Sequence, residues 1–301
     1  MSQPNSLKSI FYALAANLAI AVAKLAAAIV TNSGSMMAES IHSFADSGNQ
    51  GLLLWGVRTA KRPPDSRHPL GYGKSIYFWS FVVAIMLFSM GGLFSIYEGS
   101  HKLQGSEGLE SPAIAIGVLV FAIVAEGLSL AGCLREVNKV RGSRSYFQWF
   151  RDTRQSELMV IFGEDLAALC GLMFALAAIA LTVVTGDPVY DAIGSIVIGV
   201  LLLVIALLVG REVKELIIGQ GVEQAKHDAM LGFLRRQPEV AHVYSLLTLQ
   251  LGNDVMVAIK ARMTPQPSDN ALIDTINATE AAFQAAFPEV VWCFFEPDNR
   301  D

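Results

Sequence analysis

Two mostly apolar stretches of the chain each hold a pair of residues that can bind a metal ion. In the first, His42 and Asp46 are four residues apart, so a helix places them one above the other on one face. In the second, Glu164 and Asp165 are adjacent. An imidazole nitrogen and carboxylate oxygens from two helices suit a borderline divalent ion such as Zn²⁺ in tetrahedral coordination. These four residues are therefore predicted to form a metal site.

Other acids in apolar sequence are expected near the predicted site. Adjacent helical residues point about 100° apart, so we expect Asp165 to be a ligand and Glu164 a second ligand or a proton acceptor. Glu39, three residues before His42, and Glu126 are expected to lie around the site or along a pathway. A structural polar network, or a proton relay without metal, is the alternative interpretation of these charges.

Membrane-spanning helices are the elements expected to position these residues. The 301-residue chain is 53% apolar and 16% charged, with a mean hydropathy of +0.45, whereas soluble proteins carry roughly 25% charged residues. About 20 apolar residues cross a bilayer as a helix. An ionisable residue there costs about 2.5–3.5 kcal/mol by insertion scales, so it usually serves function. We predict an all-α bundle of six spans: 9–30, 35–57, 76–97, 112–133, 157–183 and 189–210.

The first span contains a lysine. The span is too long for the core of a signal peptide, so we expect it to be retained. Lys24 is expected to pair with one of the intramembrane acids or to extend toward the cytoplasmic end of its helix. It is not expected to be a site residue.

Basic residues in the short loops predict the orientation. Five Lys and Arg residues lie between the second and third spans, and six lie between the fourth and fifth. The opposite loops, 31–34, 98–111 and 184–188, contain only Lys102. Because cytoplasmic loops are enriched in Lys and Arg, we expect both termini in the cytoplasm. The predicted location is an integral, multi-pass position in a bacterial cytoplasmic membrane.

Residues 211–301 differ in composition from the apolar region before them. Helical stretches at about 223–236 and 269–286 alternate with a predicted β-pair at 241–250 and 254–263, and a last apolar run follows. This αββαβ order predicts a small α/β domain, more typical of a dimerisation or docking module than of a catalytic one. We therefore divide the chain into a transmembrane domain, 1–210, and a cytoplasmic domain, 211–301.

Several functional classes are excluded by composition and motifs. A net charge of −5 gives no basic surface for nucleic acid, and three scattered cysteines form no disulfide framework. The stretch Gly71-Tyr72-Gly73-Lys74 lacks the spacing of a phosphate-binding loop. With no nucleophile or cofactor motif either, the sequence predicts neither an enzyme nor a cofactor.

The chain resembles the cation diffusion facilitator family over nearly its whole length. The resemblance rests on the Glu39-to-Asn49 stretch, the loop His68-Pro69-Leu70-Gly71-Tyr72-Gly73-Lys74, the six predicted spans and the tail. It implies a homodimeric exporter in membrane lipid that exchanges Zn²⁺ or a related divalent ion for protons. It further implies a transport site between spans two and five and a cytoplasmic domain with a ferredoxin-like, metallochaperone-like fold.

The transport site departs from the main pattern of this family. Familiar members carry His or Asp four residues before the span-five acid, where this chain has Ile161, and Glu164 is an additional acid. The adjacent Glu-Asp pair is similar to the mitochondrial zinc-transporter branch and its bacterial relatives. Zn²⁺, Co²⁺, Fe²⁺, Mn²⁺, Ni²⁺ and Cd²⁺ all remain candidate ions.

Auxiliary metal sites of the family are expected to be weak or absent. The loop site would map to Asp65, His68 and Tyr72, with tyrosine where histidine is expected. In the tail the positions to consider are His242, Lys260, Phe294, Glu296 and Asp298. We expect the tail to dimerise with few or no bound metals.

Alternating access is the mechanism that these residues suggest. An ion would bind to neutral His42 and ionised carboxylates, releasing protons, and protons from the other side would later displace it. One rival is a proton-coupled carrier of an organic solute, but few aromatic residues lie near the charged layer. The other rival is a non-transporting metal-sensing scaffold, which would have no need of His42, Asp46 and Asp165 together.

Overall fold

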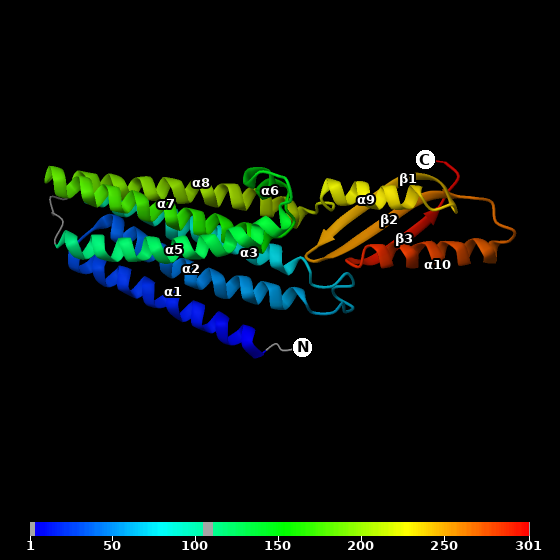
Figure 1. Cartoon of the computed structure of the whole chain (residues 1–301), viewed down its shortest axis with the longest axis horizontal. Helices are drawn as coiled ribbons and strands as arrows, with labels where there is room; N and C mark the ends of the chain where they lie inside the picture. The colour runs from blue at the N-terminus through cyan, green and yellow to red at the C-terminus, as the bar shows by residue number, and fades with distance from the viewer. Residues whose placement is uncertain (1–3, 105–110, 301) are drawn as a thin grey trace. The chain divides into compact units, whose positions relative to one another are not determined.

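The computed structural model describes residues 4–104 and 111–300, with side chains from Asn17 onward. The chain forms two compact units (Figure 1). The first comprises Met1–Trp55, Trp79–Tyr146 and Glu157–Glu212. The second comprises Gly56–Phe78, Phe147–Ser156 and Val213–Asp301.

Long helices make up the first unit, several of them continuing into the second. They are α1 (Pro4–Thr31), α2 (Gly34–Ala60), α3 (Ser75–Met86), η1 (Leu87–Leu93), α4 (Phe94–Gln104), α5 (Pro112–Val140), α7 (Ser156–Thr185) and α8 (Val189–Ile218). Within the described residues, four apolar helices are long enough to cross a membrane: Ser75–Gln104, which joins α3, η1 and α4, and the helices α5, α7 and α8. The predicted helical transmembrane region is therefore confirmed.

The helices are longer than the apolar stretches that predicted them. For example, α8 runs to Ile218 rather than residue 210, and α5 runs to Val140 rather than residue 133. Hydropathy identifies only the part of a helix that can lie in hydrocarbon, whereas Lys, Arg and Glu are good helix formers and continue the helix beyond it. Large apolar side chains on the outer surfaces of the unit, such as Phe121 and Leu207, remain exposed and are suited to contact lipid.

A π-helical segment interrupts the helix that the sequence predicted at 76–97. It is η1, Leu87–Leu93, and it contains the adjacent glycines Gly91 and Gly92. A Cβ built on Gly91 would lie 3.9 Å from His42 Nδ1, so this segment passes close to the imidazole. π-Helical turns within α-helices are frequent at functional sites.

The beginning of α2 is capped by a residue of α8. Asp191 is buried, and its carboxylate accepts hydrogen bonds from the backbone N–H of Gly34 at 2.6 Å and of Ser35 at 3.3 Å. Ser33 Oγ also donates to it at 2.8 Å, as does the Ser35 hydroxyl. Because the first N–H groups of a helix lack partners within the helix, Asp191 fixes the end of α2 from which the chain leads to His42.

A small three-stranded domain lies in the second unit. Its elements are α9 (Gln224–Arg235), β1 (Val240–Leu251), β2 (Asp254–Met263), α10 (Asp269–Ala286) and β3 (Val290–Pro297). β2 is central, antiparallel to β1 and parallel to β3. Ser268 caps α10, its hydroxyl accepting from Ala271 N, at the start of the helix that the sequence predicted at 269–286. The fully buried Phe283 packs edge-on against Phe233 in the core between helices and sheet.

The second unit also includes the segment that links α2 to α3 and all but the first residue of the short helix α6 (Tyr146–Asp152), which the sequence did not predict. Gly252, at the β1–β2 turn, has a φ of +68°, and its N–H donates to the buried Tyr77 hydroxyl at 3.1 Å. A Cβ at Gly73 would overlap the Leu251 carbonyl oxygen. The hairpin backbone therefore lies directly on the backbone of the linking segment, a contact that only glycine allows.

Candidate metal-transport site

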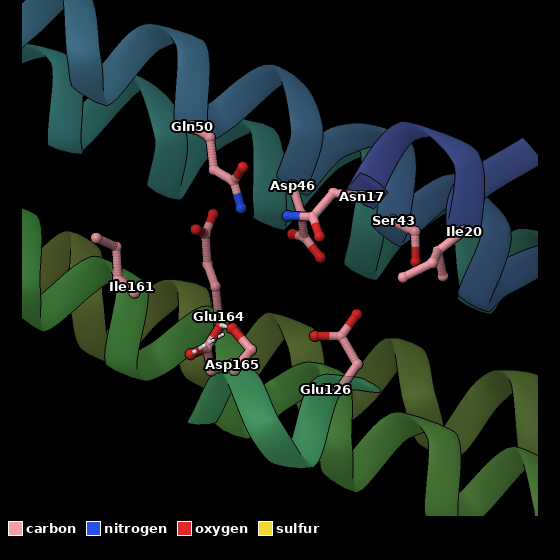
Figure 2. Close-up of a pocket in the computed structure, with 10 residues that line it drawn as sticks. Asn17, Ile20, Ser43, Asp46, Gln50, Glu126, Ile161, Glu164 and Asp165 are labelled. Atoms are coloured by element: carbon pink, nitrogen blue, oxygen red, sulfur yellow. Dashed lines mark hydrogen bonds between the residues drawn. The ribbon is translucent and has the colours of Figure 1, made fainter. Parts of the chain in front are cut away.

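An acidic cavity lies among α1, α2, α5 and α7 within the first unit (Figure 2). It has a volume of about 30 Å³, enough for a water molecule or a dehydrated ion. Its lining residues are Asn17, Ile20, Ser43, Asp46, Gln50, Glu126, Ser129, Ile161, Glu164 and Asp165. Four carboxyl groups therefore face one small space within a bundle of largely apolar helices, and a cation or protons would relieve their mutual repulsion.

The α2 side of the cavity follows from helical spacing. Ser43, Asp46 and Gln50 lie at successive three- and four-residue steps and line the cavity together. His42 Nδ1 lies 3.4 Å from Asp46 Oδ1, but His42 does not line the cavity. Within the described residues, both imidazole nitrogens and Asp46 Oδ1 are buried without a hydrogen-bond partner. His42 and Asp46 therefore form a close pair on one face of α2.

The adjacent acids of α7 turn toward different neighbouring helices. Glu164 Oε1 accepts a 2.5 Å hydrogen bond from Asn49 Nδ2 of α2. Asp165 instead accepts from Ser129 Oγ of α5, at 3.3 and 3.4 Å to its two oxygens. This divergence is the expected result of a 100° step between neighbouring helical residues. Both carboxyl groups nevertheless line the cavity, so α7 contributes acid toward both α2 and α5.

Three of the four predicted ligands share the cavity lining: Asp46, Glu164 and Asp165. Figure 2 shows Asp46 and Glu126 pointing into the space from opposite sides. Across the described part of the chain, no group of three His, Cys, Asp or Glu side chains is close enough to hold a metal ion. The structure therefore gathers the acids around one cavity without assembling a complete coordination sphere.

Polar residues of the lining that sequence reasoning missed are Asn17, Ser43, Gln50 and Ser129. Gln50 follows Asp46 by four residues and Ser129 follows Glu126 by three, so each lies on the same helical face as an acid that the sequence had identified. This spacing could have identified both Gln50 and Ser129 from the sequence. No equivalent acid on α1 marks Asn17.

The Asp65 loop is closed by its own hydrogen bonds. The Asp65 carboxylate accepts from the Tyr72 hydroxyl at 2.7 Å and from the backbone N–H of His68 and Arg67. These bonds, with the Tyr72 hydroxyl the largest contributor, lower the pKa of Asp65 to about 2. The same hydrogen bond raises the pKa of Tyr72. The Tyr72 hydroxyl thus donates to the carboxylate that a metal ion would need as a ligand.

Asp298, at the end of the tail, has local partners as well. Asp298 lies 3.2 Å from Lys260 Nζ, and its carboxylate accepts from the backbone N–H of Asn299. The Asn299 bond and the Lys260 ammonium lower the pKa of Asp298. His242 lies against the Tyr244 ring, with ring centroids 4.9 Å apart. Ion pairs and ring contacts of these kinds are common between side chains at protein surfaces.

Residues 10–218 match the model of the cation efflux transmembrane domain. This match covers more than two thirds of the chain, and the chain therefore belongs to the cation efflux, or cation diffusion facilitator, family. Members of this family are metal-cation transporters and not enzymes, in agreement with the prediction from sequence. The chain is an integral membrane protein that crosses the membrane several times.

Curated relatives come from animals, plants and bacteria. The chain is 31% identical over 231 residues to the mitochondrial proton-coupled zinc antiporter SLC30A9 of Xenopus laevis, covering 76% of this chain and 41% of that protein. It is 30% identical over 256 residues to metal tolerance protein C4 of Arabidopsis thaliana, covering 84% and 56%. Identity to magnetosome protein MamB of Paramagnetospirillum magneticum is 26% over 260 residues, covering 85% and 81%.

These relatives agree with the expected resemblance to the mitochondrial zinc-transporter branch. The chain spans about two fifths of the length of the zinc antiporters that it matches. Their activity and substrate are therefore carried to this chain only as a proposal.

Proposed function

We propose that the protein exports Zn²⁺, or a related divalent metal cation, in exchange for protons. The main support is the cavity that Asp46, Glu126, Glu164 and Asp165 line within the family's transmembrane domain. The family relatives named as zinc antiporters favour Zn²⁺ among the candidate ions. An imidazole with two unpartnered nitrogens near these acids fits the same ion.

His42, Asp46 and Asp165 are the proposed ligands, with Glu164 as a fourth ligand or a proton acceptor. His42 and Asp46 are on α2, whereas Glu164 and Asp165 are on α7, so a small relative movement of two helices would bring the donors together or part them. Ligands must lose protons to bind metal, and protons on the other side compete the ion away. Alternating access then couples metal and proton movement through one site without a chemical step.

The proposed membrane arrangement keeps all six predicted spans. α1 and α2 would be the first two, since the polar composition of α2 follows from the functional residues on it. Both termini and the domain 211–301 would face the cytoplasm of a bacterium, because the Lys and Arg residues concentrate in two loops on that side. The order α9-β1-β2-α10-β3 favours a ferredoxin-like fold for that domain.

We also propose a homodimer that forms through this domain. Leu247, Ala258 and Phe294 are register neighbours across β1, β2 and β3, so they share one face of the sheet. Leu247 and Phe294 are exposed large apolar residues on it. Such a face is suited to a second copy. Chemical cross-linking of the wild-type protein and of Phe294→Glu tests this, and a dimer unaffected by the substitution would exclude this face.

Transport in proteoliposomes under a pH gradient tests the proposed site. We expect His42→Ala and Asp165→Ala to abolish Zn²⁺ transport, and the exposed outer acid Asp187 serves as a matched control in the variant Asp187→Asn. A milder defect for Glu164→Gln than for Asp165→Asn would support the ranking of the two acids. Full transport by His42→Ala and Asp165→Ala would refute the site, and competition by other divalent ions across pH 6 to 8 would identify the preferred metal.

A further inference from the structure

Lys24 is a fully buried base on α1, about two helical turns before the end of that helix. Its Nζ donates to Ser43 Oγ at 2.7 Å and lies 3.4 Å from Glu39 Oε2. Glu39 is also fully buried, so water does not share this ion pair. The sequence expectation that Lys24 pairs with an intramembrane acid is confirmed. Since a buried charge is costly even when paired, the pair calls for a functional explanation.

Three helices meet at the Glu39 carboxyl group. Lys24 approaches it from α1, Glu39 itself belongs to α2, and Gly171 of α7 lies against its other oxygen. A Cβ at Gly171 would overlap Glu39 Oε1, so glycine leaves the room that this carboxyl group occupies. Within the described residues, Glu39 Oε1 has no hydrogen-bond partner. Glu39 therefore has one carboxylate oxygen paired with Lys24 and, within the described residues, one without a hydrogen-bond partner.

The ion pair borders the acidic cavity on one side. Ser43, which accepts from Lys24, lines the cavity, and Ile20, one turn before Lys24, lines it too. Lys24 and Glu39 are closer in sequence to the turn joining α1 and α2 than the cavity residues of either helix. The pair thus stands between the cavity and that turn, one helical turn from His42.

We propose that Lys24 is a tethered cation that keeps Glu39 out of the metal-ligand set. This inference rests on the proposed metal transport at the neighbouring site. A carboxylate inside the bundle needs a positive partner, which is a proton, a metal ion or a lysine. Lys24 supplies that partner from within the protein, and its charge also repels an ion that moves beyond the site toward the α1–α2 turn. Lys24 is a positioning residue in this scheme and does not touch the metal.

The two single substitutions should change the Zn²⁺ affinity in opposite directions, and the double substitution should restore it. Lys24→Met leaves Glu39 unpaired beside His42 as an additional ligand, so Zn²⁺ should bind at least about tenfold more tightly and be transported more slowly. Glu39→Gln leaves an unpaired ammonium near the site, so Zn²⁺ should bind about tenfold more weakly. In the double variant both effects cancel, and affinity should return to within about threefold of wild type. A tenfold change in affinity corresponds to about 1.4 kcal/mol, and the two opposite changes sum to about zero in the double variant.

Calorimetric titration of Zn²⁺ into the full-length protein in nanodiscs measures these affinities, and proteoliposome transport accompanies it. If the wild-type protein binds Zn²⁺ but Lys24→Met binds it within twofold of wild type, the tethered-cation role is overturned and the metal site stands. If the wild-type protein binds no divalent metal, the transport proposal itself is overturned, and this inference with it.

The double variant keeps the test decisive if Lys24→Met does not fold. It buries no unpaired charge, so it is expected to remain folded and to bind Zn²⁺ like the wild type. A double variant that is folded but binds Zn²⁺ more than tenfold more weakly would mean that Glu39 is itself a ligand, contrary to the proposal. If the ion pair only stabilises the fold, the single variants should unfold at a lower temperature than the wild type but bind Zn²⁺ with the same affinity.

Discussion

Asp191 offers a quantitative test of how α2 is held in place. Its carboxylate accepts the backbone N–H groups of Gly34 and Ser35, both of which are buried at the beginning of α2. In Asp191→Ala these two donors lose their partner. An unsatisfied buried donor costs about 1–3 kcal/mol, so the expected loss in free energy of unfolding is about 2–6 kcal/mol. Because α2 carries His42 and Asp46, we also expect weaker metal binding.

Asp187→Ala is the matched control for this prediction. Asp187 is an exposed acid four residues earlier that caps the first turn of α8, accepting from Val189 N at 3.0 Å. Loss of such a cap in contact with water should cost about 0.5–1 kcal/mol. Unfolding of both variants in mixed micelles, followed by helical circular dichroism, measures the difference, and amide hydrogen exchange at Gly34 and Ser35 localises it. Equal destabilisation by the two substitutions, or unchanged exchange at Gly34 in Asp191→Ala, would refute the capping role.

Two further predictions concern packing and pH. Phe283→Ala should destabilise the three-stranded domain by about 3–5 kcal/mol, because the ring is fully buried against Phe233. Ile273→Ala, on the exposed side of the same helix, should change the stability by less than about 0.5 kcal/mol. Hydrogen exchange of the full-length protein measures both changes. The pKa of Asp65, lowered to about 2, means that the carboxylate's contribution to the loop is complete above pH of about 4 and is lost as the pH falls toward 2. Tyr72→Phe removes the largest cause, so the Asp65 midpoint in ¹³C NMR of labelled aspartate should rise toward about 3.9, and an unchanged midpoint would contradict this account.

Local periodicity predicted the elements of the tail and the residues that approach the cavity. The β-pair about Gly252 and the helix beginning after Ser268 were both predicted, because turn and capping residues act over a few positions. The grouping of Asp46, Glu164 and Asp165 was predicted from their cost inside a membrane. The turn and capping signals lie within a few positions of the sequence, whereas the acids of α2 and α7 were grouped by their shared cost inside a membrane.

Features that depend on packing between helices were not predictable from spacing alone. Nothing in the sequence of Leu87–Leu93 indicates a π-helix rather than an α-helix. The sequence offered several acids as partners for Lys24, and only the approach of α1 to α2 selects Glu39. Likewise, the position of His42 outside the cavity lining depends on the rotation of α2, which a four-residue spacing does not determine.

The backbone contact between Gly73 and Gly252 has a consequence for chimeric transporters. A Cβ on Gly252 would overlap the Gly73 carbonyl oxygen, and a Cβ on Gly73 would overlap the Leu251 carbonyl oxygen. A tail grafted from a relative with a different hairpin turn would be forced away from the linking segment, even if both parts were well folded. A chimera should therefore replace the segment Gly56–Phe78 and the tail together, with both taken from the same relative.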